Sequence, residues 1–100
     1  MQNQPDPAAL PPAPEPSDTE AYPEWLNKHV RLKLIRRRVE LKKTPHSMAI
    51  RGKLSAQTIR NIEKGTHSPT LTTLALICGQ LDGTQVQQLF PGGADLKGDG

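Results

Sequence analysis

Residues 44–65 read TPHSMAIRGKLSAQTIRNIEKG, and this stretch decides the fold. It predicts two short helices, one over about residues 45–51 and one over about residues 56–64. Gly52 and Lys53 form the tight corner between them. The second helix carries polar and basic side chains. The first helix and the corner can therefore hold the second helix so that its polar side contacts a partner molecule.

Both predicted helices have clear end signals. Thr44 caps the free amides of the first helix, and Pro45 fills its first turn without losing a useful donor. Ser55 caps the second helix. That helix ends at Gly65, because glycine readily takes the left-handed conformation that terminates a helix. Two apolar residues flank the Ser55 cap as a hydrophobic staple, which fixes how the chain enters the helix. They are Leu54 and Ile59.

The second helix divides into an apolar and a polar side. At about 100° per residue, Ile59 and Ile62 lie roughly 60° apart and define the buried side. The opposite side carries the long polar side chains of Gln57, Arg60, Asn61 and Lys64. Gln and Asn amides can form two hydrogen bonds with adenine, Arg can form two with guanine, and the small Ala56 can touch a thymine methyl group. This side suits the major groove of duplex DNA, although a polar outer face is also typical of any surface helix.

Charge is distributed unevenly along the chain. Residues 25–90 hold twelve Lys or Arg and three acids, a net charge of +9, whereas residues 1–24 hold five acids and no base. Such a density of positive charge favours a polyanionic partner. The free backbone amides that follow Thr44 and Ser55 are natural phosphate-binding groups. A solvated basic surface, which many small domains have, is the alternative.

The 100 residues leave room for one small domain. Residues 1–23 contain seven of the ten prolines and few apolar residues. They are predicted to be a disordered acidic tail, because they bury too little surface to offset their chain entropy. The tail is interpreted as a flexible leader or as a docking peptide for a protein partner. An arm that wraps DNA is not favoured, since the DNA phosphates would repel its acids. The ordered domain is predicted over residues 24–91, followed by a flexible C-terminal tail at 92–100.

Apolar residues at three-to-four-residue spacing predict the remaining helices. The first spans about residues 24–42, or breaks near Val30. Its stripe consists of Leu26, Val30, Leu34, Ile35, Val39 and Leu41. Another opens at 69–70 and stops at 82–83, with a stripe of Leu71, Leu74, Ile77 and Leu81. A short fifth helix, over about residues 84–90, carries Val86, Leu89 and Phe90. The predicted fold class is all-α, a five-helix bundle with short connections.

Other classes of function find little support in the chain. Cys78, the single cysteine, lies in the apolar run LALIC and is interpreted as a buried thiol. His29, His46 and His67 are widely spaced and lack the cysteine or carboxylate neighbours needed for metal binding or nucleophile activation. An enzyme is therefore not expected, and no cofactor or small-molecule ligand is predicted. No apolar stretch approaches the ~20 residues that span a bilayer. No signal peptide is expected, because the N-terminal residues lack an early basic cluster and an apolar core. A cytoplasmic protein without membrane contact is therefore expected.

Four pieces of sequence occur together in a fixed order: MA at 48–49, LS at 54–55, TIRNIEKG at 58–65 and SPTLTTLALI at 68–77. Together they resemble the lambda-repressor/Cro-like helix-turn-helix domain, also called the XRE family, over residues 31–90. The resemblance implies five helices of the lambda-repressor-like type and a homodimer on a nearly palindromic operator in double-stranded DNA. It also implies that helix 56–64 enters the major groove.

The resemblance implies roles for individual residues as well. The base readers would be Ala56, Gln57, Arg60 and Asn61. The phosphate contacts would flank this helix and would comprise Thr44, His46, Ser55, Lys64, Thr66, His67 and Ser68. The family often pairs an Arg of its first helix with the Glu near the end of the second motif helix. These positions match Arg38 and Glu63, so Glu63 is expected to be structural rather than catalytic.

Three positions depart from the family pattern. The family usually has glycine where Lys53 stands, but here Gly52 comes one place early. Either Lys53 takes a left-handed conformation at some strain, or the corner has a different shape. The family usually has apolar residues where Lys43 and Gly83 stand, which predicts thinner packing and modest stability.

The expected function is that of a sequence-specific transcriptional regulator, a repressor or autoregulator of bacterial or phage type that is associated with the nucleoid. No ligand-sensing domain is expected, so regulation would come through concentration, partner binding or proteolysis. The apolar residues of the fifth helix either form a dimer interface or close the core of the monomer. The alternative function is an antitoxin or a protein-bridging module whose main role is to bind a protein partner.

Overall fold

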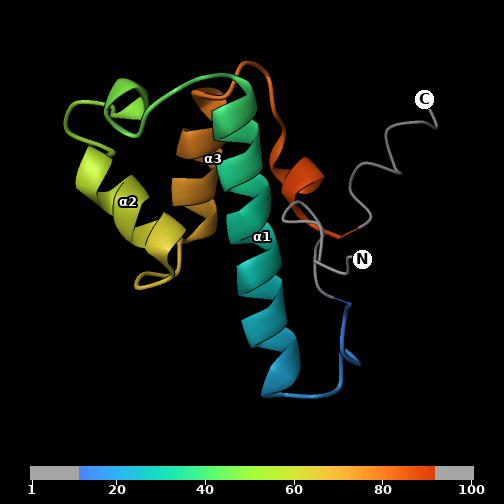
Figure 1. Ribbon diagram of the computed structural model, residues 1–100. Coiled ribbons are helices and arrows are strands. Elements are labelled where there is room, and N and C mark those ends of the chain that lie inside the picture. Colours follow the sequence, from blue (N-terminus) through green and yellow to red (C-terminus); the bar gives the residue numbers. More distant parts are fainter. Residues whose placement is uncertain (1–11, 92–100) are drawn as a thin grey trace, which may run out of the picture.

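The computed structural model describes residues 12–91, and all regular elements within them are helical. Three α-helices and two short 3-10 turns follow one another along the chain (Figure 1). They are α1 (Ala21–Glu40), η1 (His46–Met48), α2 (Ala56–Lys64), α3 (Leu71–Gly79) and η2 (Val86–Leu89). The all-α class is therefore confirmed for this part of the chain. The two predicted tails at 1–11 and 92–100 lie outside the described residues.

The predicted count of five helices is not confirmed, because the segments at 45–51 and 84–90 form 3-10 turns instead of α-helices. After η1, Ala49 is already extended and Gly52 has a φ of +78°, so the chain turns back at once. In η2, the Gln88 side chain accepts a hydrogen bond from the Gln85 N–H at 2.7 Å, which closes a single turn. Nucleating an α-helix is costly in segments this short, so the local turns win.

Helix α1 is continuous, begins at Ala21 rather than near residue 24, and does not break at Val30. Its start is fixed by Asp18, whose carboxylate accepts hydrogen bonds from the N–H groups of Glu20 and Ala21 at 3.1 and 2.8 Å. Residues 21–23, which the sequence analysis places in the tail, therefore belong to the helix. Its first turns extend beyond the other two helices (Figure 1).

The core lies where the three α-helices meet, and both 3-10 turns contribute to it. Its fully buried members are Val30, Leu34, Met48, Leu54, Ile59, Ile62, Leu74, Ile77, Cys78, Leu81 and Leu89. Each buried Leu, Ile or Val contributes about 1.5–3 kcal/mol relative to an exposed one. Val86 and Phe90 pack against this core beside Leu89, so the apolar side of η2 closes the monomer's core.

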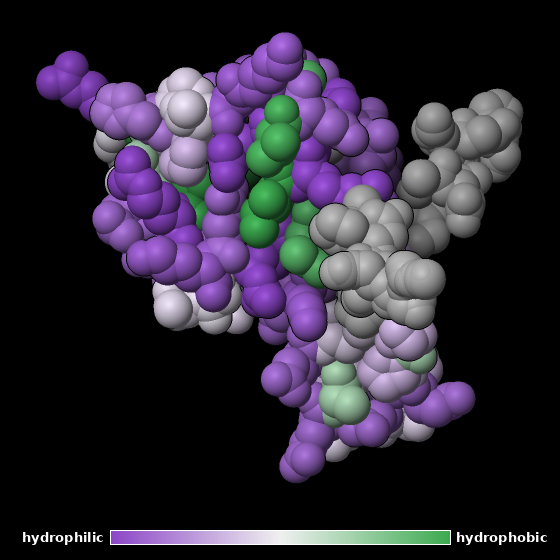
Figure 2. Space-filling model, in the orientation of Figure 1, coloured by the Kyte–Doolittle hydropathy of each residue, from purple (hydrophilic) through white to green (hydrophobic). Residues whose placement is uncertain are grey.

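Two residues of the predicted apolar stripes are exposed. Val39 is 59% exposed and Leu71 is 66% exposed. Val39 is five positions after the buried Leu34, which places it about 140° away around the helix. Leu71 is the first residue of α3, one turn before the buried Leu74. Figure 2 shows a stripe of hydrophobic surface down the middle of this face, over α1, with mostly hydrophilic surface on both sides.

Two departures from the family pattern have structural explanations. The Lys43 ammonium donates hydrogen bonds to the Gln80 carbonyl at 2.8 Å and to the Asp82 carboxylate at 2.9 Å. Lys43, which stands where the family usually has an apolar residue, therefore links the segment after α1 to the turn after α3. Asp82 and Gly83 both have positive φ, +46° and +85°, and the turn that they form favours glycine at the second position.

His29 of α1 is a buried polar residue, only 6% exposed, and its ring lies 5.1 Å from that of Trp25. Neither ring nitrogen has a hydrogen-bond partner within residues 12–91. Burial, with a smaller contribution from the charge of Lys33, lowers the pKa of His29 below its ordinary value of 6.5. The folded protein therefore holds this imidazole neutral where the unfolded chain would protonate it.

This burial predicts a pH dependence of stability. Because the folded pKa is depressed, His29 supports the folded state fully above pH 6.5, and that contribution is lost as the pH falls through 6.5 towards the folded pKa. Thermal unfolding of the wild type should therefore show a lower midpoint at pH 5.5 than at pH 7.5. The variant His29→Leu, which cannot take up a proton there, should lose less stability over this interval. Equal losses in the two proteins would contradict the prediction.

Candidate nucleic-acid interface

Helix α2 begins and ends where its sequence signals predict. The Ser55 hydroxyl accepts a hydrogen bond from the Thr58 N–H at 3.0 Å, and Ser55 is the N-cap. Leu54 and Ile59, the two residues of the predicted staple, are both buried in the core. Gly65 takes a left-handed conformation, with a φ of +84°, and ends the helix. These local interactions limit α2 to nine residues and hold its start firmly against the core.

The apolar and polar sides of α2 are oriented as the helical periodicity predicts. Ile59 and Ile62 are buried, whereas Gln57 and Arg60 are exposed and Asn61 is half-buried on the outer side. Helix α2 lies at one edge of the molecule, where α1 does not cover its outer side (Figure 1). Ala56 is half-buried at the start of the helix. The amide and guanidinium groups are therefore accessible to a partner.

Two of these polar side chains are arranged as a pair. The Gln57 amide nitrogen donates a hydrogen bond to the Asn61 amide oxygen at 3.0 Å, one helical turn away. The pair leaves the Gln57 oxygen as an acceptor and the Asn61 nitrogen as a donor. An acceptor beside a donor is the pattern that complements the major-groove edge of adenine.

The residues assigned to phosphate contacts flank α2 on both sides, but three of their hydroxyls already serve the fold. The Thr44 hydroxyl accepts from the Ser47 N–H at 3.0 Å, and the Ser55 hydroxyl caps α2. The Thr66 hydroxyl donates to the Asn61 carbonyl at 3.1 Å, which uses its single hydrogen. The remaining four side chains of the set are exposed and make no such contact within residues 12–91. They are His46, Lys64, His67 and Ser68.

A bidentate ion pair joins the end of α2 to α1. The Arg38 guanidinium donates to both carboxylate oxygens of Glu63, at 2.6 and 2.8 Å, and also to the Lys43 carbonyl at 2.8 Å. The two side chains are only 18% and 16% exposed. The hydrogen bond to Glu63 raises the pKa of Arg38, although burial acts against it. The geometry gives Glu63 a structural role, since its carboxylate is fully engaged in orienting α2.

The corner before α2 has a feature that the sequence did not predict. Gly52, with a φ of +78°, takes the left-handed conformation, while Lys53 does not. The strained left-handed conformation of Lys53 is therefore not adopted, and the second alternative, a corner of different shape, is the one that remains. Arg51 and Lys53 flank the glycine and are both exposed. The signal that could have identified them was the placement of two bases beside a turn-forming glycine.

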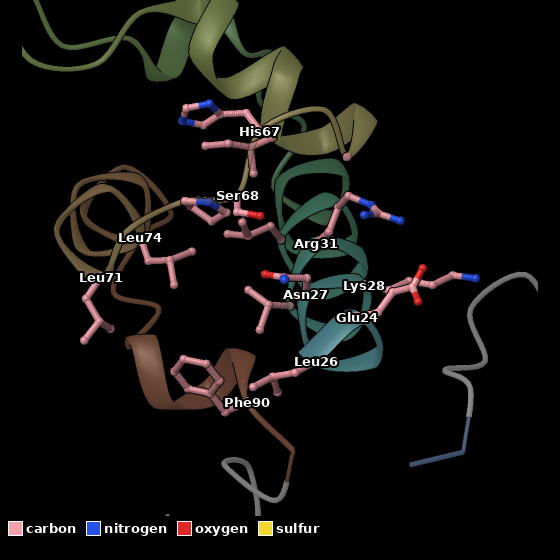
Figure 3. Close-up of a pocket in the computed structure, with 15 residues that line it drawn as sticks. Glu24, Leu26, Asn27, Lys28, Arg31, His67, Ser68, Leu71, Leu74 and Phe90 are labelled. Atoms are coloured by element: carbon pink, nitrogen blue, oxygen red, sulfur yellow. The ribbon is translucent and has the colours of Figure 1, made fainter. Parts of the chain in front are cut away.

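A cavity of about 560 Å³ lies between α1, the segment 65–69, the start of α3 and the end of η2 (Figure 3). Leu26, Leu71, Leu74 and Phe90 give it an apolar part, and His67 and Ser68 lie at its edge. The Arg31 guanidinium passes so close to Gly65 that a Cβ there would lie 2.8 Å from Nη1. This cavity is distinct from the outer side of α2.

No group of three or more His, Cys, Asp or Glu side chains within residues 12–91 is placed to hold a metal ion. Cys78 is buried, as predicted, and burial raises the pKa of its thiol to about 11. Among the helices of this same part of the chain, none combines the length and the apolar character needed to cross a bilayer.

An all-helical domain that presents a short, capped polar helix beside a basic corner has the architecture of a nucleic-acid-binding domain. The helix-turn-helix family model HTH_3 matches residues 32–88, more than half of the chain, and the protein belongs to this family. Membership indicates a DNA-binding transcription regulator of the XRE type. No curated protein and no solved structure shows significant similarity to the chain. The first half of α1 precedes the matched residues.

Proposed function

We propose that this protein is a sequence-specific regulator of transcription, a repressor or autoregulator, that reads duplex DNA by inserting α2 into the major groove. We further propose that it binds as a homodimer to two half-sites about one helical turn, or ~34 Å, apart. Such a protein would act at the nucleoid.

The observation that carries the proposal is the orientation of α2. Its isoleucines are buried, Gln57 and Arg60 are exposed, and Asn61 is half-buried on the outer side. The helix lies at the edge of a domain whose residues 25–90 have a net charge of +9. The free acceptor of Gln57 and the free donor of Asn61 fit adenine, and Arg60 fits guanine through a bidentate contact. The half-buried Ala56 lets the start of the helix approach a thymine methyl group.

Groups at the two ends of α2 would hold the helix in the major groove by contacting the DNA backbone. Lys64, His67 and Ser68 lie at one end of α2, and His46 and the amides after Ser55 lie at the other. Such contacts position a protein on the duplex and carry little sequence information. Thr44, Ser55 and Thr66 are proposed to contribute mainly through backbone N–H groups or turn geometry, because their hydroxyls are already engaged.

The experiment that tests this proposal is selection of duplexes from a random pool with purified full-length protein, followed by titration of the selected duplex over a salt series. A DNA reader should enrich a short, nearly symmetric sequence. Its log–log plot of affinity against salt concentration should fall with a slope of about −0.9 for each phosphate contacted. Failure to enrich any sequence, together with no duplex binding at low salt, would refute the proposal.

A second candidate function, that of an antitoxin or protein-bridging module, is favoured by the cavity of Figure 3. Leu71 is 66% exposed beside it, and Leu26 and Phe90 line it. A partly apolar hollow with an exposed leucine at its rim offers a protein partner an apolar contact surrounded by polar groups. If a specific partner is found, Leu71→Asp should abolish its binding and leave DNA binding unchanged. Loss of DNA binding in Leu71→Asp without loss of folding would argue against two separate surfaces.

A further inference from the structure

The segment between η1 and α2 forms a tight hairpin. The Ile50 N–H donates to the Leu54 carbonyl at 2.7 Å, and the Leu54 N–H donates to the Ile50 carbonyl at 2.8 Å. Residues 51–53 form the tip between them, and the left-handed Gly52 stands at its centre. This tip, Arg51-Gly52-Lys53, is called the basic tip below.

The basic tip is held rigidly although it is exposed. Leu54 is buried in the core, and Ser55, the next residue, caps α2. Ile50, on the other side of the hairpin, packs against the same core. The tip therefore has a fixed position relative to the first turn of α2, at the end of that helix that lies away from α1 (Figure 1).

The two cations of the basic tip are unpaired in the described part of the chain. Neither Arg51 nor Lys53 makes a side-chain hydrogen bond or an ion pair within residues 12–91. Three other bases of the domain are engaged: Arg37 with Glu40 and Thr84, Arg38 with Glu63, and Lys43 with Asp82. Arg60 and Lys64 of α2, in contrast, are exposed and unpaired within residues 12–91, like the two bases of the tip. A Cβ added to Gly52 would meet nothing within 4 Å, so the tip stands in open solvent.

The basic tip forms one wall of an open groove of about 500 Å³ that also includes η1 and the first turn of α2. Its apolar lining comes from Ala49, Ile50, Leu54 and Ala56. Its remaining side chains are basic or hydroxyl-bearing, those of His46, Arg51, Lys53, Ser55 and Thr58. No acid lines this groove in the described part of the chain. An apolar lining beside cations complements a sugar–phosphate backbone, whose sugars are largely apolar and whose phosphates are anionic.

We propose that this groove holds the backbone of one DNA strand at the edge of the major groove, with Arg51 and Lys53 each neutralising a phosphate. The inference rests on the proposed function and extends it, because these two residues lie outside the motif positions to which the resemblance assigns contacts. In this chain the short turn η1 is followed at once by a basic hairpin, which brings these two cations next to the start of α2. The hairpin contributes affinity for DNA of any sequence and leaves the reading of bases to α2.

The double variant Arg51→Gln/Lys53→Gln tests the proposal. Removing two phosphate contacts should make the log–log salt dependence less steep by about 1.8, and should weaken binding roughly 60-fold at 0.1 M salt if counterion release supplies the whole contribution. Affinity for the selected duplex and for a scrambled duplex should fall by the same factor. Fluorescence anisotropy of labelled duplexes measures both quantities, and circular dichroism checks that the variant remains folded.

The matched control is Lys28→Gln/Arg36→Gln, which removes the same charge from two exposed positions of α1. It should change the slope much less. The proposal is overturned if the two double variants behave alike, or if the tip variant alters base preference while the salt slope stays constant. These outcomes differ from failure of the proposed function, in which the wild-type protein itself would bind no duplex.

Discussion

Replacing Glu63 by alanine is expected to lower the free energy of unfolding by about 3 kcal/mol, at the lower end of the range for breaking a buried ion pair. The variant leaves the Arg38 guanidinium, only 18% exposed, without the carboxylate that accepts two of its hydrogen bonds. A domain of this size should then melt at least about 10 °C lower. Thermal and urea unfolding followed by circular dichroism measure the loss.

A second ion pair on α1 supplies a matched control. Arg37 and Glu40 lie 3.3 Å apart, but their side chains are 39% and 59% exposed. Glu40→Ala should therefore cost less than about 1 kcal/mol, because an exposed pair is screened by water. In the double variant Arg38→Met/Glu63→Met, part of the Glu63→Ala loss should be recovered, since no lone charge remains. Similar losses in Glu63→Ala and Glu40→Ala would contradict this account of how α2 is held.

Arg60→Ala is expected to weaken binding to the preferred DNA site by about 1–3 kcal/mol and to relax preference at one base pair. Arg60 is exposed on the outer side of α2 and makes no hydrogen bond within residues 12–91, so folding should change little. Selection from a random pool with the variant, compared with the wild type, measures the change in preference. An unchanged preference would show that Arg60 does not read a base.

Lys64→Ala is the control for Arg60→Ala from the same helix. Lys64 is the last residue of α2 and is exposed. As a phosphate contact it should weaken binding to all duplexes by a similar factor and make the salt slope shallower by about 0.9. A shift in base preference in Lys64→Ala would instead assign it to the reading of bases. The two variants together separate sequence reading from electrostatic attraction.

Helix α2 shows how far local signals reach. The Ser55 cap, the staple at Leu54 and Ile59 and the glycine terminator all act within about four residues, the reach of one helical turn. The sequence therefore predicts the start, the end and the buried side of this helix, and the structure agrees. Which of its exposed residues touch DNA stays a prediction, because that contact involves a second molecule.

Other apolar patterns led to wrong predictions, because tertiary packing decides whether a residue is buried and whether a short segment becomes an α-helix. Leu71 has the spacing of a buried residue, but it precedes the part of α3 that the other helices cover. The segments at 45–51 and 84–90 have helical periodicity but form only single 3-10 turns. A pattern of apolar residues cannot show whether a segment is long enough to overcome the cost of nucleation in its setting.

By itself the sequence determined an all-helical domain, the exact side of α2 that is buried, and the separation of an acidic beginning from a basic body. Capping, periodicity and charge act between near neighbours or through simple counts, so they can be read along the chain. Only the tertiary structure decided that Lys43 reaches Asp82, that His29 is buried, and that Arg51 and Lys53 border an open groove. These results depend on how helices and turns pack in three dimensions, and residues far apart in sequence meet only after that packing is set.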